Sequence, residues 1–111
     1  MIEFVVDRRD TGMAVVTPQG RLTMVSARRF KELLTELVAT GHPRIVVDLA
    51  ETTFLDSSGL GALIAGLKSA RQASGDLRIA RPTAAVVTVL ELTNMDKVLR
   101  ARDDVERAFD V

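Results

Sequence analysis

The stretch Ile45-Val46-Val47-Asp48-Leu49 decides the fold class of this chain. Its continuous run of β-branched and apolar residues is typical of a strand covered on both faces. Soon after it, a helical pattern begins at Ser58 and continues to about Ser74, with leucines and an isoleucine on one stripe. A buried strand followed by an apolar helix indicates an α/β protein, because helices must cover the sheet.

Upstream of this stretch, residues 2–6 and 13–17 are expected to be strands. The short polar turn over residues 7–12 predicts that they form an antiparallel hairpin. Pro18 and Gly20 are expected to end the second strand. A helix is predicted from Met24 to Thr40, since Thr23 is a plausible N-cap and Gly41 can take the left-handed conformation that ends it.

Downstream, residues 77–80 predict a strand and residues 82–93 a helix, and Asn94 suits a left-handed position after it. Val98-Leu99 is expected to form a last short strand, and Asp103 to begin a final helical piece carrying Val105, Ala108 and Phe109. The alternation of strands and helices predicts parallel pairing after the hairpin. We therefore expect one α/β domain over residues 1–111, with a mixed sheet of 4–5 strands and about four helices.

The composition excludes several function classes. The chain has 15 basic and 15 acidic residues, so a nucleic-acid surface is not expected. There is no cysteine, and the single histidine, His42, lies in a Gly-His-Pro loop pattern. We therefore expect no metal site, no catalytic triad and no bound cofactor. No apolar run is long enough to span a membrane and no signal peptide is visible, which indicates a cytoplasmic protein.

The most informative polar residues are Asp56, Ser57 and Ser58, which lie between the buried strand and the apolar helix. A helix N-terminus has unpaired N–H groups and partial positive charge, so hydroxyls there either cap the helix or carry a phosphate. Only one serine is needed as a cap. Ser58 lies nearer the helix body, and we expect it to cap while Ser57 faces solvent.

The helix after Ser58 is unusually rich in small residues, including Gly59, Gly61 and Gly66. Each interior glycine costs about 1 kcal/mol relative to alanine in a helix. Two explanations remain open at this point: close packing on the sheet, or a smooth surface on which another protein docks.

Familiar nucleotide-binding motifs do not fit this region. A P-loop needs contiguous Gly-Lys-Ser or Gly-Lys-Thr, and Leu67 interrupts that order. A dinucleotide fingerprint needs a third glycine where Ile64 stands. Asp48 and Asp56 lack the further carboxylates of a receiver-like phosphoacceptor site. A flavodoxin-like enzyme or nucleotide-binding protein is therefore the least favoured alternative, and we expect no catalytic residues.

Residues 54–63, Phe-Leu-Asp-Ser-Ser-Gly-Leu-Gly-Ala-Leu, resemble the signature of STAS domains of the anti-sigma factor antagonist family. The resemblance extends to residues 45–49, to Gly20-Arg21-Leu22, to residues 75–77 and to residues 92–94. It covers nearly the whole chain and implies the STAS fold.

The resemblance also implies a function. In this family the first serine after the aspartate, here Ser57, is phosphorylated by an anti-sigma factor that is also a serine kinase. The unphosphorylated form binds the anti-sigma factor, the phosphorylated form releases it, and a serine phosphatase restores binding. ATP and magnesium belong to the kinase. The implied partner-binding residues are Asp56, Ser58, Gly59, Leu60, Gly61, Arg21 and Thr23, and the expected state is a monomer or weak dimer.

One departure from the family pattern lies at Gly20-Arg21-Leu22-Thr23, where the family often has Gly-Glu-Leu-Asp. Arg21 reverses a charge, and Thr23 replaces an acid that would help to contact a partner. This departure favours an alternative in which the chain is a STAS adaptor without a phosphate switch, in a stress-signalling scaffold or a lipid-transport complex.

Overall fold

The strand β3 (Arg44–Asp48) lies inside the sheet, as its sequence predicts. The structure is a computed structural model that describes residues 2–9 and 11–109. Ile45, Val46 and Val47 are fully buried. Ile45 and Val47 pack in the core that includes the helices, whereas Val46 packs against C-terminal residues on the other face. The prediction of a strand covered on both faces is confirmed.

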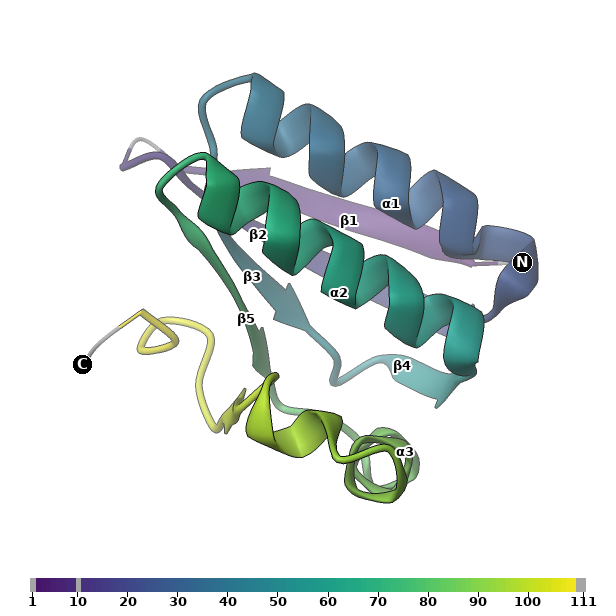
Figure 1. Cartoon of the computed structure of the whole chain (residues 1–111). Helices are drawn as coiled ribbons and strands as arrows, with labels where there is room; N and C mark the ends of the chain where they lie inside the picture. The colour runs from purple at the N-terminus through teal and green to yellow at the C-terminus, as the bar shows by residue number, and fades with distance from the viewer. Residues whose placement is uncertain (1, 10, 110–111) are drawn as a thin grey trace.

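The sheet is mixed, with an antiparallel hairpin at its start (Figure 1). β1 (Glu3–Arg8) pairs antiparallel with β2 (Met13–Leu22), so the predicted hairpin is confirmed; its turn contains residue 10, which lies outside the described residues. β2 pairs in parallel with β3, and β3 with β5 (Asp76–Ala80). The short strand β6 (Ala101–Arg102) extends the parallel part beside β5.

The strand β2 continues past Pro18 and Gly20 and changes its parallel partner on the way. Its pairing with β3 ends at Val16, and its pairing with a further strand, β4 (Thr52–Leu55), begins at Gly20. Pro18 stands between these two ladders, where its missing N–H interrupts neither. The prediction that β2 ends at residues 18–20 is therefore wrong, and β4 was not predicted.

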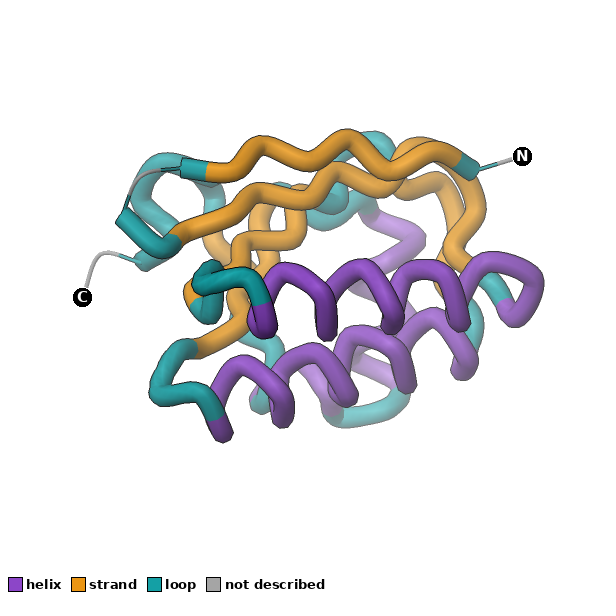
Figure 2. Tube along the Cα trace, turned by 90° about the horizontal axis from the view of Figure 1, so that it is seen from above, coloured by secondary structure: helices purple, strands orange, loops and turns teal. Residues whose placement is uncertain are grey.

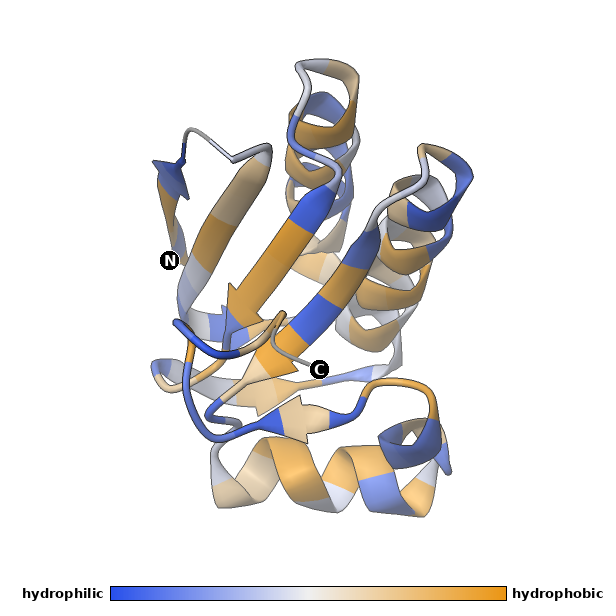
Figure 3. Ribbon diagram, turned by 90° about the vertical axis from the view of Figure 1, so that its left-hand side faces the viewer, coloured by the Kyte–Doolittle hydropathy of each residue, from blue (hydrophilic) through white to orange (hydrophobic). Residues whose placement is uncertain are grey.

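Two helices cover one face of the sheet (Figures 1 and 2). α1 (Met24–Ala39) and α2 (Ser57–Gln72) lie side by side there, and their buried leucines meet the strands in one core. The hydropathy colouring in Figure 3 follows this division, with apolar residues along the central strands. A third helix, α3 (Ala84–Leu92), packs against β4 below the carboxyl end of the sheet.

The region after α3 differs from its prediction. Asn94 is left-handed as expected, with φ 59°, but a 3₁₀ turn, η1 (Met95–Lys97), follows it. Val98-Leu99 is not a strand: Leu99 is buried in the core, and β6 forms further on. The residues from Asp103 onward form bends and turns in place of the predicted helix.

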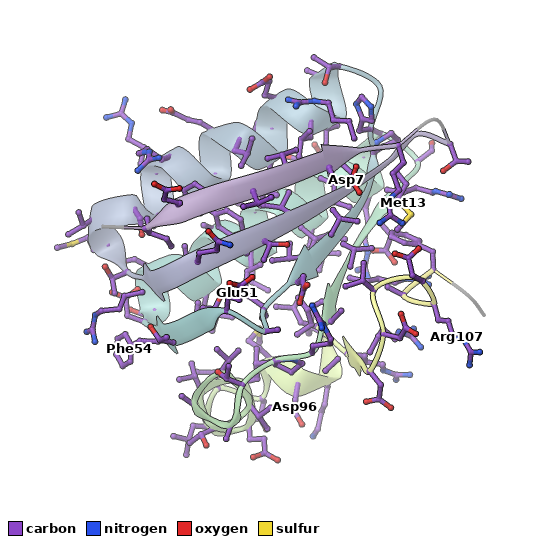
Figure 4. The ribbon with its side chains drawn as sticks, turned by 180° about the vertical axis from the view of Figure 1, so that it is seen from behind. Asp7, Met13, Glu51, Phe54, Asp96 and Arg107 are labelled. Carbon is purple, nitrogen blue, oxygen red and sulfur yellow. The ribbon has the colours of Figure 1, made fainter. Side chains whose placement is uncertain are left out.

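The C-terminal turns cover part of the second face of the sheet. Val105, Ala108 and Phe109 pack there with Met13 and other strand residues, and Figure 4 shows this segment beside Met13. The Arg44 and Arg78 guanidinium carbons lie 5.4 and 4.6 Å from the Phe109 ring centroid. These side chains therefore contact the sheet surface from turns, although their spacing would also suit a helix.

Over the described residues the protein thus has six strands and three α-helices, against 4–5 strands and about four helices predicted. The extra strand is β4, and the absent helix is the C-terminal one. Across residues 2–9 and 11–109, none of the helices combines the length and the apolar character that a bilayer crossing requires.

Candidate functional site

The side chain of Asp56 organises the start of two helices. Asp56 is the N-cap of α2, and its Oδ1 accepts a hydrogen bond from the Gly59 N–H at 2.8 Å. Its Oδ2 accepts one from the Met24 N–H, in the first turn of α1, at 3.0 Å. Asp56 therefore caps α2 in place of Ser58. The physical reason is that the negative carboxylate meets the positive ends of both helix dipoles at once.

Ser57 is the first residue of α2 and is exposed, whereas Ser58 is half-buried. The prediction that Ser57 faces solvent is confirmed. Because Asp56 caps the helix, the Ser57 hydroxyl is not required for that purpose. A small nucleophilic group thus stands at the surface, at the positive end of a helix.

The glycines of α2 divide into two kinds. A Cβ on Gly59 would lie 2.4 Å from the carbonyl oxygen of Leu22, and a Cβ on Gly66 would lie 2.5 Å from Leu34 Cδ1. These two glycines let α2 lie close to β2 and α1. A Cβ on Gly61 would meet nothing within 4 Å, and Gly61 is exposed. Close packing therefore explains Gly59 and Gly66 but not Gly61.

Gly61 lies in a shallow groove that begins at Ser57. The groove has a volume of about 440 Å³ and separates α2 from the segment that connects α3 to η1. Leu60 is almost completely buried, with 7% of its surface exposed. Most of the lining is apolar, with Lys68 as its one charged residue: Ser57, Leu60, Gly61, Ile64, Ala65, Lys68, Thr93 and Met95.

Apolar side chains are also exposed around the start of α1, where the Met24 N–H donates to Asp56, the residue before Ser57. Met24 and Val25 are 73% and 90% exposed, and Phe54 is 38% exposed. The Arg21 guanidinium carbon lies 4.5 Å from the centroid of the Phe54 ring. Figure 4 shows Phe54 at the outer end of β4, directed away from the sheet. We call the exposed residues Met24, Val25 and Phe54, together with Arg21 stacked on Phe54, the apolar rim.

The predicted site residues therefore meet at the carboxyl ends of β2 and β4. Arg21 is one of the last two residues of β2 and pairs with Phe54 of β4. Thr23 follows β2 and is the N-cap of α1, where its backbone N–H donates to Ser26 Oγ at 3.3 Å. Gly59 is buried and supports the surface from below. Sequence reasoning missed the exposed Met24, Val25 and Phe54. The available signal was that Met24 and Val25 lie off the buried stripe of α1, which contains Phe30, Leu34 and Leu37.

Asp48 does not join this site. Its Oδ1 accepts hydrogen bonds from Arg81 Nε and from the Ala50 N–H, each at 3.2 Å. This ion pair raises the pKa of Arg81, mainly through the hydrogen bond to the Asp48 carboxylate. In the described part of the chain, no three His, Cys, Asp or Glu residues are grouped as metal ligands would be.

The site thus consists of an exposed serine at the start of a helix that covers the sheet, with an apolar groove and exposed apolar side chains near it. The family model of the STAS domain matches residues 5–108. The chain therefore belongs to the STAS domain family, and the resemblance of residues 54–63 is confirmed.

Three relatives show how far the similarity extends. An anti-sigma factor antagonist from Mycobacterium paratuberculosis has a crystal structure that matches with a TM-score of 0.84 at 28% identity, covering 97% of this chain and 91% of that one. The crystal structure of a Thermotoga maritima protein, provisionally named an anti-sigma factor antagonist, matches with a TM-score of 0.87 at 26% identity. The match covers 96% of this chain and 92% of that one. The anti-sigma-B factor antagonist of Listeria monocytogenes is 24% identical over 102 residues, covering 92% of this chain and 90% of its own.

Proposed function

We propose that this chain is an anti-sigma factor antagonist that binds an anti-sigma factor with serine kinase activity, and that phosphorylation of Ser57 releases that partner. A serine phosphatase returns the chain to its binding form. The observation that carries the proposal is the exposed Ser57, which lines an apolar groove and follows Asp56, the residue that is hydrogen-bonded to Met24 of the apolar rim. The names of the relatives support the partner class.

We treat the groove and the rim as one candidate interface, because Ser57 lines the groove and the adjoining Asp56 accepts a hydrogen bond from Met24 of the rim. Large exposed apolar side chains such as Met24 and Val25 are typical of protein-binding surfaces when they cluster. Gly61 adds a flat position in the groove that packing does not explain. A partner that covers both areas encloses Ser57 at the centre of the interface, where contacts are fully desolvated.

A phosphate at Ser57 acts on this interface through its charge. It adds about −1.5 to −2 charges at neutral pH. The neighbouring Asp56 carboxylate is already committed to two backbone N–H groups and stays beside it. Burying both groups under a partner combines like-charge repulsion with desolvation, which costs several kcal/mol at an interface. We therefore expect phosphorylation to weaken binding at least a hundredfold.

The same phosphate should leave the fold intact. Ser57 is exposed, so its modification displaces no core side chain. The positive end of α2 stabilises an added anion by about 0.3–1 kcal/mol, which offsets part of the repulsion from Asp56. The proposed switch therefore changes the surface and not the folded structure.

Intact-mass spectrometry tests the modification. The chain is incubated with ATP and a serine kinase anti-sigma factor from the same genome, and a gain of about 80 Da, one phosphoryl group, is expected. Ser57→Ala should abolish the gain. Ser58→Ala, the matched control on the next residue, should keep it. A phosphorylated Ser57→Ala protein would refute the site.

Calorimetric titration with the same partner tests the switch. The unmodified chain should bind, and the phosphorylated chain should bind at least a hundredfold more weakly. Arg21, which departs from the family pattern, favours a second candidate, a constitutive adaptor. Equal affinity of both forms, or a stable complex with a partner that lacks a kinase domain, would support the adaptor and contradict the switch.

A further inference from the structure

A second polar site lies at the opposite end of α2. It is a pocket of about 280 Å³ between the last turn of α2, the strand β5 and the segment from η1 to β6. Six of its lining residues are charged, and five of these are cations: Arg71, Arg78, Lys97, Arg100 and Arg102, with Asp76 as the acid. A chain with equal numbers of acidic and basic residues has therefore concentrated positive charge in one place.

The single acid in the pocket is shared by two of the arginines. Arg71 Nε donates to Asp76 Oδ1 at 3.1 Å, and Arg78 Nε donates to Asp76 Oδ2 at 3.3 Å. Both carboxylate oxygens are thus engaged. The pocket retains a large positive excess, because one carboxylate offsets only one of the five cations.

The remaining three cations have no ion-pair partner among residues 2–9 and 11–109: Lys97, Arg100 and Arg102. Arg102 carries a second sign of an unmet interaction. Its Nε is buried and finds no hydrogen-bond partner within the described chain. Buried polar groups normally have a partner, so the Arg102 guanidinium, which lines the pocket, is not fully satisfied by acceptors of the described chain.

We propose that this pocket binds a small anion through its phosphoryl group. Guanidinium groups present paired N–H donors that match phosphate oxygens, and a lysine adds a point charge. A phosphoryl anion relieves the mutual repulsion of the cations and supplies acceptors for Arg102. The pocket is concave and small, which suits an anion the size of phosphate or pyrophosphate better than a peptide segment.

The site is independent of the proposed switch. Arg71 and Ser57 lie at opposite ends of α2, which at 1.5 Å per residue places them about 20 Å apart. Loss of phosphorylation at Ser57 would leave this proposal standing, and the reverse also holds.

Nuclear magnetic resonance titration of the full chain tests the proposal. Inorganic phosphate, pyrophosphate and a nucleoside diphosphate are added separately, at constant ionic strength set with chloride. We expect saturable shifts of the backbone amides of residues 71–78 and 97–102. Comparing the three anions tells whether a free phosphate or a phosphate ester is preferred, because both present the same group.

Two variants and a control make the test decisive. Arg100→Gln and Lys97→Gln alter exposed residues and should each weaken phosphate or pyrophosphate binding at least fivefold. Lys31→Gln, an exposed cation on α1, should leave it unchanged. Non-saturating shifts, an equal loss with Lys31→Gln, or tighter binding of a glutamate-rich peptide of matched charge would each overturn the assignment to a phosphoryl anion.

Discussion

Replacing Gly61 by alanine should stabilise this protein, whereas the same replacement at Gly59 should destabilise it. Both glycines lie in α2, two residues apart, and the chemical change is identical. The difference lies in the space around each Cβ. At Gly61 nothing lies within 4 Å, but at Gly59 the new Cβ would lie 2.4 Å from the Leu22 carbonyl oxygen and 2.8 Å from Leu55 Cδ1.

The magnitudes follow from two opposing effects. Alanine at residue 61 gains about 1 kcal/mol of helix propensity with no steric cost. Alanine at residue 59 gains a similar amount but forces α2 away from the end of β2, and such overpacking costs about 1–3 kcal/mol. The obstructing atom at residue 59 belongs to the backbone, so the upper part of that range applies. A net destabilisation of about 1–2 kcal/mol remains.

Urea denaturation measures both changes. With a slope of about 2 kcal/mol per molar, Gly61→Ala should raise the midpoint by about 0.5 M, and Gly59→Ala should lower it by about 0.5–1 M. Shifts of the same sign for the two variants would refute the reasoning. Gly61→Gln then tests the groove separately: it should keep the fold but weaken partner binding, because a long side chain obstructs a flat surface.

Three further outcomes follow from the contacts described above. Asp56→Ala should lower the free energy of unfolding by about 2 kcal/mol, since it removes caps from two helices; Ser58→Ala, measured by the same urea titration, should change it by less than about 0.5 kcal/mol. Arg21→Ala should lower the free energy of unfolding by less than about 1 kcal/mol, because its contact with Phe54 is exposed. A larger decrease, measured by thermal unfolding, would contradict a purely surface role. Phe109→Ala should cost about 2 kcal/mol through lost burial and cation–π contacts. An unchanged urea midpoint for that variant would mean that the C-terminal turns contribute nothing to stability.

The part of the fold predicted from sequence is the part encoded by local patterns. The β-branched run at Ile45–Val47 can be recognised without knowing its neighbours in the sheet, because a continuous apolar run is itself typical of a strand buried on both faces. The helix of α2 and the exposed Ser57 are equally local, since they depend on periodicity and on the residue types at a helix start.

The strand β4 was missed because its evidence is not local. It has four residues, two of which are threonines. It forms because β2 is no longer paired with β3 beyond Val16, so its backbone is free to pair with β4 from Gly20 onward. A buried hydrogen bond from Thr52 Oγ1 to the Pro18 carbonyl, at 3.1 Å, joins the two strands at this point. Pro18 was wrongly predicted to end the strand because its position between the β3 and β4 pairings of β2 is visible only in the folded structure.

The C-terminal segment was predicted as a helix because Val105, Ala108 and Phe109 are spaced for one. Its real partners are the exposed side of the sheet and the guanidinium groups of Arg44 and Arg78. An isolated helix of this length is only marginally stable. The contacts with the sheet therefore determine the backbone conformation more strongly than helix propensity does. Tertiary packing therefore decides the backbone there.

The hydrogen bonds of Asp56 also have a mechanical consequence. Its two oxygens hold residues from separate helices, Met24 and Gly59, within reach of one side chain. A change in the position of the Asp56 carboxylate, which adjoins Ser57, should therefore affect the beginnings of α1 and α2 together. Under the proposed switch, a phosphate on Ser57 should consequently affect the groove and the apolar rim at the same time.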